Sequence, residues 1–379
     1  MFRMVYPFLA VFGRGLGVDL TTMSLALSMR SLTGAMGPFL ASVGDSRGRK
    51  FGMLFGLSLF VVGVGLVVVW PTFPVFVLAL ILSLLGKYVF DPSMQAYLGD
   101  RVVYERRGRV LAITELGWSL SFVLGVPLMG LLISRWGWNS PFFVLTLLGL
   151  ISFGVLVWLV PHDPARSGQP PSLWINLRKI LTYPPALAGL AMGFLFSSAN
   201  EVVNLVFGIW LEDSFGLQIA ALGAAAGVIG LAELGGESFA AGFTDRLGKP
   251  VAVGLGLGLN CLAALVLPFL GASTTSAVLG LFFFYLTFEY ALVSTVPLMT
   301  EVFPPARATV MAVSAASISL GRALGALIAT PLYLFAKSSS VIPDILPSAL
   351  AAVAFNLLAL AALRILQKGI GSWKGSRVI

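Results

Sequence analysis

The sequence has almost none of the residues that build disulfides or metal centres. Its 379 residues include one cysteine, Cys261, and one histidine, His162. This excludes a disulfide framework and argues against a Cys/His metal site. No Gly-x-x-x-x-Gly-Lys-Ser/Thr phosphate loop occurs either. We therefore expect no metal, no cofactor and no use of ATP.

Charge is also scarce. Asp, Glu, Lys and Arg make up 11% of the chain, 58% is hydrophobic, and the mean hydropathy is +0.96. A soluble domain carries about 25% charged residues, so the composition predicts an integral membrane protein. The formal net charge is +8, but the basic residues gather in particular loops. Membrane topology explains them better than a nucleic-acid partner does.

Apolar runs long enough for a membrane helix, about 20 residues each, recur along the whole chain. We predict an all-α protein with twelve transmembrane helices, six in each half. Their expected spans are about 1–12, 20–43, 51–70, 73–98, 109–134, 140–160, 186–211, 219–243, 251–270, 276–302, 308–336 and 345–365.

These spans divide the chain into two bundles joined by a loop. The expected parts are a bundle over 1–160, a central loop over 161–185, a bundle over 186–366, and a basic tail over 367–379. Within the loop, residues 172–181 are expected to form a short surface helix. Its apolar side would hold Trp174, Ile175 and Leu177, and its basic side Arg178 and Lys179.

One turn occurs twice. The segment around Asp45, in the pattern Asp-x-x-Gly-basic, returns in weaker form around Asp245, which lies 200 positions later. The next basic hinge keeps this offset, at Arg107 and Arg307. Two copies of one half-protein are the simplest explanation, so we expect two pseudo-symmetric six-helix bundles. Such repeats are common in transporters.

The distribution of Lys and Arg predicts the orientation. Most of them lie in loops on the same side as the turn between the second and third helices, whereas the other side holds only Arg14, Arg135 and Lys337. Cytoplasmic loops retain basic residues. We therefore expect a multi-pass protein of the plasma membrane, with both termini and the central loop in the cytoplasm.

The first apolar run is short. Residues 1–12 would rise about 18 Å, against a hydrocarbon core of about 30 Å. The second-half counterpart begins near Pro185, so the repeat predicts that helix 1 starts before residue 1 and is truncated here. A first helix that is simply short is the alternative.

The repeated turn resembles the loop signature of the major facilitator superfamily, Gly-x-x-x-Asp-Arg-x-Gly-Arg-Lys. It is matched at Asp45, Gly48, Arg49 and Lys50, and departs from the pattern at Ala41 and Ser46. The second copy keeps Asp245, Arg246 and Gly248. The resemblance covers essentially the whole chain. It implies the two-bundle fold and a cytoplasmic latch that holds the halves together in the outward-open state.

A second motif is similar to the family's antiporter signature in helix 5. Gly125, Pro127 and Gly130 match it, with Val126 inserted before the proline. A tolerated proline kink is the alternative. In helix 4 the family's intramembrane Arg is replaced by Leu82. The resemblance is closest to the drug-efflux branch and implies export, while the departure puts the usual proton-coupling scheme in doubt.

Ionisable side chains inside membrane helices are the candidates for a proton or substrate site, because burying them costs at least about 2.5–3.5 kcal/mol. The first-half candidates are Arg30, Lys87, Asp91 and Glu115. Lys87 and Asp91 are four apart and can form an ion pair. Glu115 lies near the cytoplasmic end of its helix, which favours pairing with a loop Arg.

The second-half candidates are Glu201, Glu233, Glu289 and Arg322. Glu201 sits in a polar stretch between Ser197 and Asn204, which must face a cavity or other helices, not lipid. Glu289 would exchange protons if it is buried alone, and would stay charged if it pairs with Arg322.

Together these patterns predict a secondary active transporter, not an enzyme. We expect a monomer that exports a small amphipathic or hydrophobic compound by alternating access, with the proton as coupling ion. A lipid or glycolipid flippase and an uncoupled facilitator are alternatives, and a non-transporting sensor or scaffold is a further one.

Overall fold

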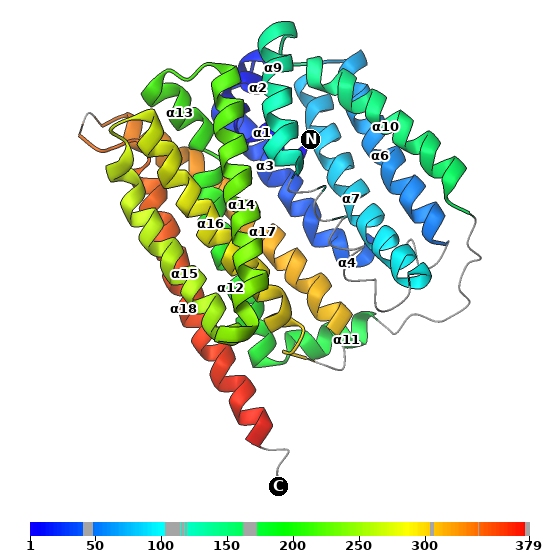
Figure 1. Ribbon diagram of the computed structural model, residues 1–379, viewed down its shortest axis with the longest axis vertical. Helices are drawn as coiled ribbons and strands as arrows, with labels where there is room; N and C mark the ends of the chain where they lie inside the picture. The colour runs from blue at the N-terminus through cyan, green and yellow to red at the C-terminus, as the bar shows by residue number, and fades with distance from the viewer. Residues whose placement is uncertain are drawn as a thin grey trace. The chain divides into compact units, whose positions relative to one another are not determined.

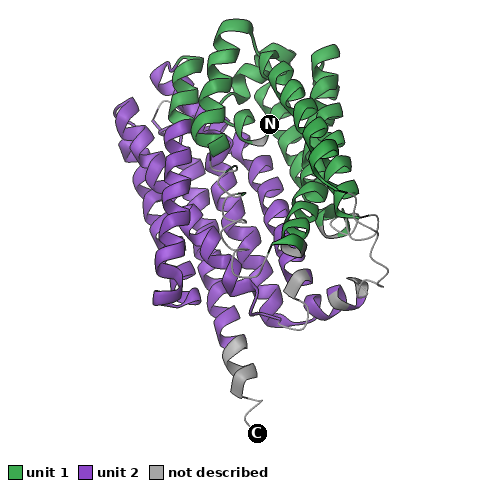
Figure 2. Ribbon diagram, turned by 45° about the vertical axis from the view of Figure 1, so that its right-hand side comes forward, with its two compact units in different colours: residues 1–169, 218–226 green, residues 170–217, 227–379 purple. Residues whose placement is uncertain are grey.

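The computed structural model describes residues 1–40, 48–102, 114, 117, 120–161, 173–303, 307–339 and 341–375, and the secondary-structure elements in these residues are helices (Figure 1). It divides into two compact units (Figure 2). Unit 1 comprises residues 1–169 and 218–226, and unit 2 comprises residues 170–217 and 227–379.

Within the described residues, nine helices are long and apolar enough to cross a membrane. This confirms an all-helical membrane protein, while the count of twelve stays a prediction. The nine spans are Arg49–Val69, Phe73–Leu98, Ser140–Leu159, Pro184–Phe215, Ile219–Leu247, Lys249–Leu270, Thr274–Met299, Thr309–Lys337 and Leu346–Gly369.

Unit 1 is built around the pair α6 and α7. Its elements are α1 (Phe2–Val5), α2 (Leu9–Leu16), α3 (Leu20–Thr33), η1 (Gly34–Met36), α4 (Gly37–Leu40), α6 (Arg49–Val69), α7 (Phe73–Arg101), η2 (Ser121–Gly125), α9 (Val126–Trp136) and α10 (Ser140–Leu159). A Cβ at Gly56 of α6 would lie 2.5 Å from the Gly86 carbonyl oxygen of α7. Only glycine permits so close an approach between these helices.

In unit 2, α12 packs against α17 and α18, and α15 packs against α16 and α18. The elements are α11 (Leu173–Leu181), α12 (Pro184–Asn204), α13 (Phe207–Phe215), α14 (Ile219–Leu247), α15 (Lys249–Val266), η3 (Leu267–Leu270), α16 (Thr274–Met299), α17 (Arg307–Lys337) and α18 (Leu346–Gly375). Met192, Phe196, Leu257, Phe288 and Leu366 are part of one buried apolar core. The first residues of α14, up to Ala226, belong to unit 1.

Several expected helices are interrupted, among them the first, the second and the seventh. The first ends at Val5 and resumes as α2, which continues to Leu16 instead of stopping at residue 12. Pro7 lies in the break, and a proline cannot donate a backbone hydrogen bond. The second changes to a 3-10 turn at Gly34, where glycine lowers helix propensity. The seventh breaks after Asn204, before α13 begins.

The repeat is visible in the backbone of each unit. Gly48 immediately precedes α6 and has φ +97°, and Gly248 immediately precedes α15 and has φ +85°. Such values are accessible to glycine and rare for other residues. A Cβ at Gly256 would meet Tyr290 at 2.9 Å. The equivalent contact in unit 1, shifted by 200 positions, is that of Gly56 with the Cβ of Phe90, also at 2.9 Å.

Candidate transport site

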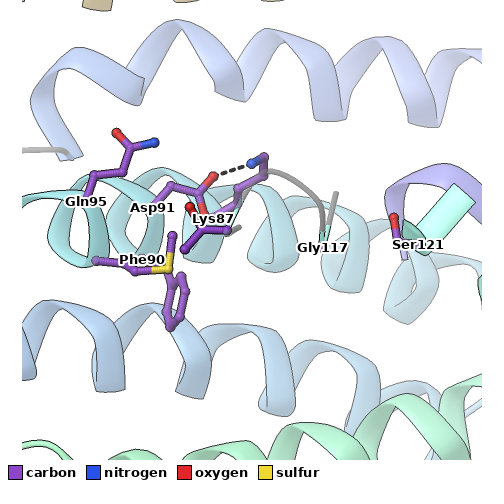
Figure 3. Close-up of a pocket in the computed structure, with 8 residues that line it drawn as sticks. Lys87, Phe90, Asp91, Gln95, Gly117 and Ser121 are labelled. Atoms are coloured by element: carbon purple, nitrogen blue, oxygen red, sulfur yellow. Dashed lines mark hydrogen bonds and ion pairs between the residues drawn. The ribbon is translucent and has the colours of Figure 1, made fainter. Parts of the chain in front are cut away.

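A pocket of about 450 Å³ lies against α7 in unit 1 (Figure 3). Lys87 and Asp91 form an ion pair one turn apart at its wall, and each side chain is about one third exposed. Both polar and apolar side chains line it, so the pocket suits a ligand with both characters. The lining residues are Lys87, Phe90, Asp91, Met94, Gln95, Thr114, Gly117 and Ser121.

The π-helical turn η2 brings Ser121 to this pocket. It spans Ser121–Gly125 and directly precedes Val126 and Pro127. The missing N–H of Pro127 removes a helical hydrogen bond, and a π turn takes one more residue than an α turn does. Val126, inserted relative to the antiporter signature, is thereby accommodated. Gly130 allows close packing, because a Cβ there would meet Phe8 at 2.9 Å.

Arg30 is buried in α3, within unit 1. Its Nη2 donates a hydrogen bond of 2.7 Å to the Tyr6 hydroxyl, and its Cζ lies 5.5 Å from the centre of the Tyr6 ring. Arg30 is not among the residues that line the pocket. The structure therefore places one of the two first-half cations at the pocket, Lys87, and the other in the packing of α3. Glu115 lies outside the described residues.

Glu201 is fully buried in α12, the membrane-crossing helix of unit 2 that also carries Asn204. The Asn204 Nδ2 donates to Glu201 Oε2 at 3.3 Å, and the Tyr285 hydroxyl donates to Asn204 Oδ1 at 2.7 Å. A Cβ at Gly325 would lie 2.6 Å from that of Glu201. Glu201 thus lies where α12 contacts α17. The hydrogen bonds from Glu201 through Asn204 to Tyr285 extend to α16.

The remaining second-half candidates lie on three other helices. Glu233 of α14 and Glu289 of α16 are buried, and Arg322 of α17 is partly buried. A Cβ at Gly236 would lie 2.9 Å from that of Glu289, so α14 and α16 approach each other at the level of Glu289. Within the described residues, no group of three or more His, Cys, Asp or Glu side chains converges to hold a metal ion.

The described residues of the two repeated turns lie at helix ends. The Nζ of Lys50, in the first turn of α6, donates to the Val157 carbonyl at 2.8 Å, beside the adjacent Arg49. Asp245 and Arg246 are exposed near the end of α14. In the second copy of the repeated motif, Lys249 forms an ion pair with Glu301. The motif did not reveal this partner. Asp45 lies outside the described residues.

Sequence reasoning also missed a buried polar network in unit 2. The Asn260 Nδ2 donates to the Phe284 carbonyl at 2.7 Å and to Thr287 Oγ1 at 3.0 Å, and Asn356 Nδ2 donates to Asn260 Oδ1 at 2.7 Å. The only sequence signal was one asparagine in each of two apolar helices. The network was missed because the sequence analysis considered only charged residues inside the membrane helices.

Membrane-crossing helices with charged side chains buried among them define a multi-pass transport protein, because such charges are costly and are kept for function. Residues 1–326 match the Major Facilitator Superfamily. The chain belongs to this family of transporters, and it is therefore a transporter and not an enzyme.

Relatives agree with this assignment. The chain is 29% identical over 317 residues to the uncharacterized MFS-type transporter YceJ of Bacillus subtilis, covering 81% of this chain and 79% of the relative. A 139-residue stretch is 27% identical to the multidrug resistance protein fnx1 of Schizosaccharomyces pombe, covering 37% of this chain and 26% of the relative.

The fold is that of a solved transporter. The crystal structure of the nucleoside transporter NupG (D323A mutant) superposes with a TM-score of 0.77, over 96% of each chain and at 14% identity. At this identity the likeness shows the fold alone.

Proposed function

We propose that the protein exports a small amphipathic compound in exchange for protons, and that Glu201 carries the proton. The observation that supports this is the complete burial of Glu201 in a membrane-crossing helix, where its carboxylate accepts a hydrogen bond of 3.3 Å from Asn204. A buried carboxylate is costly while charged and much less so when neutral. Its protonation therefore changes the relative free energies of the transporter's conformations.

The polar chain of Asn204 and Tyr285 fits a role in proton transfer. Asn204 is held from one side by the Tyr285 hydroxyl and donates to Glu201 from the other. The side-chain amide is thus fixed so that its N–H group faces the carboxylate. In this arrangement the ionised form of Glu201 accepts a hydrogen bond from Asn204. Glu289 is the second candidate carrier.

The substrate side of the proposal rests on the pocket beside α7. Its volume of about 450 Å³ falls in the range of small-molecule sites, about 300–1,000 Å³. Phe90 and Met94 supply apolar surface, and the ion pair of Lys87 with Asp91 supplies charge of both signs. The short match to a multidrug resistance protein favours efflux. We further propose a monomer in the plasma membrane, with both termini in the cytoplasm.

The test uses the full chain in liposomes that contain a pH-sensitive dye, with an imposed pH gradient and a panel of cationic, neutral and anionic amphiphiles. We expect substrate-dependent proton movement in the wild type and its loss in Glu201→Gln or Glu289→Gln. Glu212→Gln is the matched control, because Glu212 lies near the end of α13 and is only partly buried.

Full proton coupling in both buried-site variants would contradict the proposal. If no compound moves protons in the wild type while the protein stays folded, proton-coupled export is wrong. A lipid-flipping assay with fluorescent lipids on the same liposomes would then test the flippase alternative.

A further inference from the structure

The short helix α11, ahead of the first membrane helix of unit 2, has apolar and basic side chains on the same outer face. Ile180 is fully buried in the core that also contains Leu366, and Leu177 is partly buried. Ile175 is 58% exposed and Leu181 47%. The expectation that Ile175 lies on the same side of the helix as Leu177 is therefore wrong, because only Leu177 lies near the helical position of Ile180.

Two cations share this outer face. Arg178 and Lys179 are exposed, α11 contains no acidic residue, and neither cation has an ion-pair partner among the described residues. This outer face thus combines two exposed aliphatic side chains with two cations. It suits the boundary between lipid headgroups and acyl chains, where apolar side chains can insert and basic ones can reach phosphate.

The exposed face of α18 locates this boundary. Its outward side carries Leu350, Leu357 and Ile365, which are 51%, 55% and 59% exposed. The exposed cations Arg364 and Lys368 lie at the far end of this band, beside Ile365. From Leu350 to Lys368 the helix rises about 27 Å, close to the hydrocarbon thickness of about 30 Å. The headgroup level therefore lies near Lys368.

The same level includes the end of α11. A Cβ at Gly369 of α18 would lie 2.5 Å from the ring of Pro185, and Pro185 is the second residue of α12. Only Thr182 and Tyr183 separate α11 from α12. The helix α11, which packs against α12 and α17 (Figure 1), is thus held beside the end of the lipid-facing band.

We infer that the outer face of α11 is a binding surface for anionic phospholipid headgroups. Ile175 and Leu181 insert among the upper acyl carbons, and Arg178 and Lys179 contact the phosphates. Each basic residue near an anionic surface increases the local preference for anionic over neutral lipid by about fivefold. This inference stands apart from proton coupling, because it uses none of the residues of the candidate transport site.

The experiment places a fluorophore at Ile175→Cys in a full chain whose only other thiol is removed by Cys261→Ala. Vesicles contain phosphatidylcholine and phosphatidylglycerol, with a nitroxide quencher on the headgroup of one lipid or the other. We expect stronger quenching by the labelled phosphatidylglycerol. The preference should fall about fivefold for each charge removed in Arg178→Gln and Lys179→Gln, and should persist in the charge-keeping variant Arg178→Lys/Lys179→Arg.

A label at Phe269→Cys is the matched control. Phe269 is 82% exposed in η3, and the chain from Cys261 to Phe283 has no charged residue, so we expect no preference between the two lipids there. The inference is overturned if both lipids quench the position-175 label equally, or if neither lipid quenches it, since α11 would then lie in water.

Discussion

At the scale of single residues, the loop between α2 and α3 contains a titratable helix cap. Asp19 immediately precedes α3, and its Oδ1 accepts a hydrogen bond of 2.9 Å from the Thr22 backbone N–H. Hydrogen bonding by the Thr22 side chain, and then by its backbone, lowers the pKa of Asp19. A carboxylate is also favoured at this position by the helix dipole.

This cap makes the stability of the protein depend on pH in the acid range. The pKa of Asp19 is lower in the folded protein than in the unfolded chain. The cap therefore contributes its full stability above the unfolded value of about 3.9, and loses it as the pH falls through the folded value. We expect Asp19→Ala to lower Tm at neutral pH. The difference in Tm between this variant and the wild type should shrink in acid. Thermal unfolding in detergent measures both.

Asp19→Asn is the control for that experiment, because asparagine caps a helix without titrating. The difference in Tm between Asp19→Asn and Asp19→Ala should not change with pH. If the Tm of the wild type exceeds that of Asp19→Ala by the same amount at every pH, the charge of Asp19 does not contribute to stability.

The sequence predicts that an ionisable residue is buried more readily than it predicts which residues contact it. Glu201 was predicted to lie inside because a carboxylate with polar neighbours cannot face lipid, and it is fully buried. Its contacts with Gly325 and, through Asn204, with Tyr285 could not be predicted. Those residues come from helices remote in the sequence, and helical periodicity gives no register between one helix and another.

At the scale of elements, apolar length predicted where helices lie better than where they break. The spans of α6, α7 and α10 agree with expectation within a few residues, because about 20 apolar residues are needed to cross the bilayer. The π turn at Ser121 was not predicted. It depends on hydrogen-bond geometry around Pro127, which hydropathy does not record.

The polar network between α15, α16 and α18 gives a prediction at this scale. Asn260 bonds both neighbouring helices, so Asn260→Ala should destabilise the protein by about 0.5–2 kcal/mol, the range of interhelical hydrogen bonds in membranes. A double-mutant cycle with Asn356→Ala should give a coupling free energy of about 0.6 kcal/mol or more. Reversible unfolding by a denaturing detergent measures these free energies. Strictly additive effects would mean that the Asn260 to Asn356 hydrogen bond contributes nothing.

At the scale of the whole molecule, the repeat makes two turns of different sequence structurally equivalent. The first turn matches the family signature at Gly48 and the second is a weaker copy at Gly248, yet both glycines have φ above +80° and both directly precede a helix. The sequence offset of 200 positions was enough to predict this equivalence. It holds because a positive φ restricts the position to glycine whatever the neighbouring residues are.

The two turns should therefore respond alike to the same substitution. A residue with a Cβ at such φ values costs about 1–3 kcal/mol, so we expect Gly48→Ala and Gly248→Ala each to lower the free energy of unfolding by that amount. Gly258→Ala is the control. Its Cβ would meet nothing within 4 Å in α15, and alanine there should be neutral or stabilising by up to about 1 kcal/mol. If Gly48→Ala is destabilising and Gly248→Ala is not, the second turn tolerates another backbone conformation, and the equivalence of the two turns is limited to their sequence pattern.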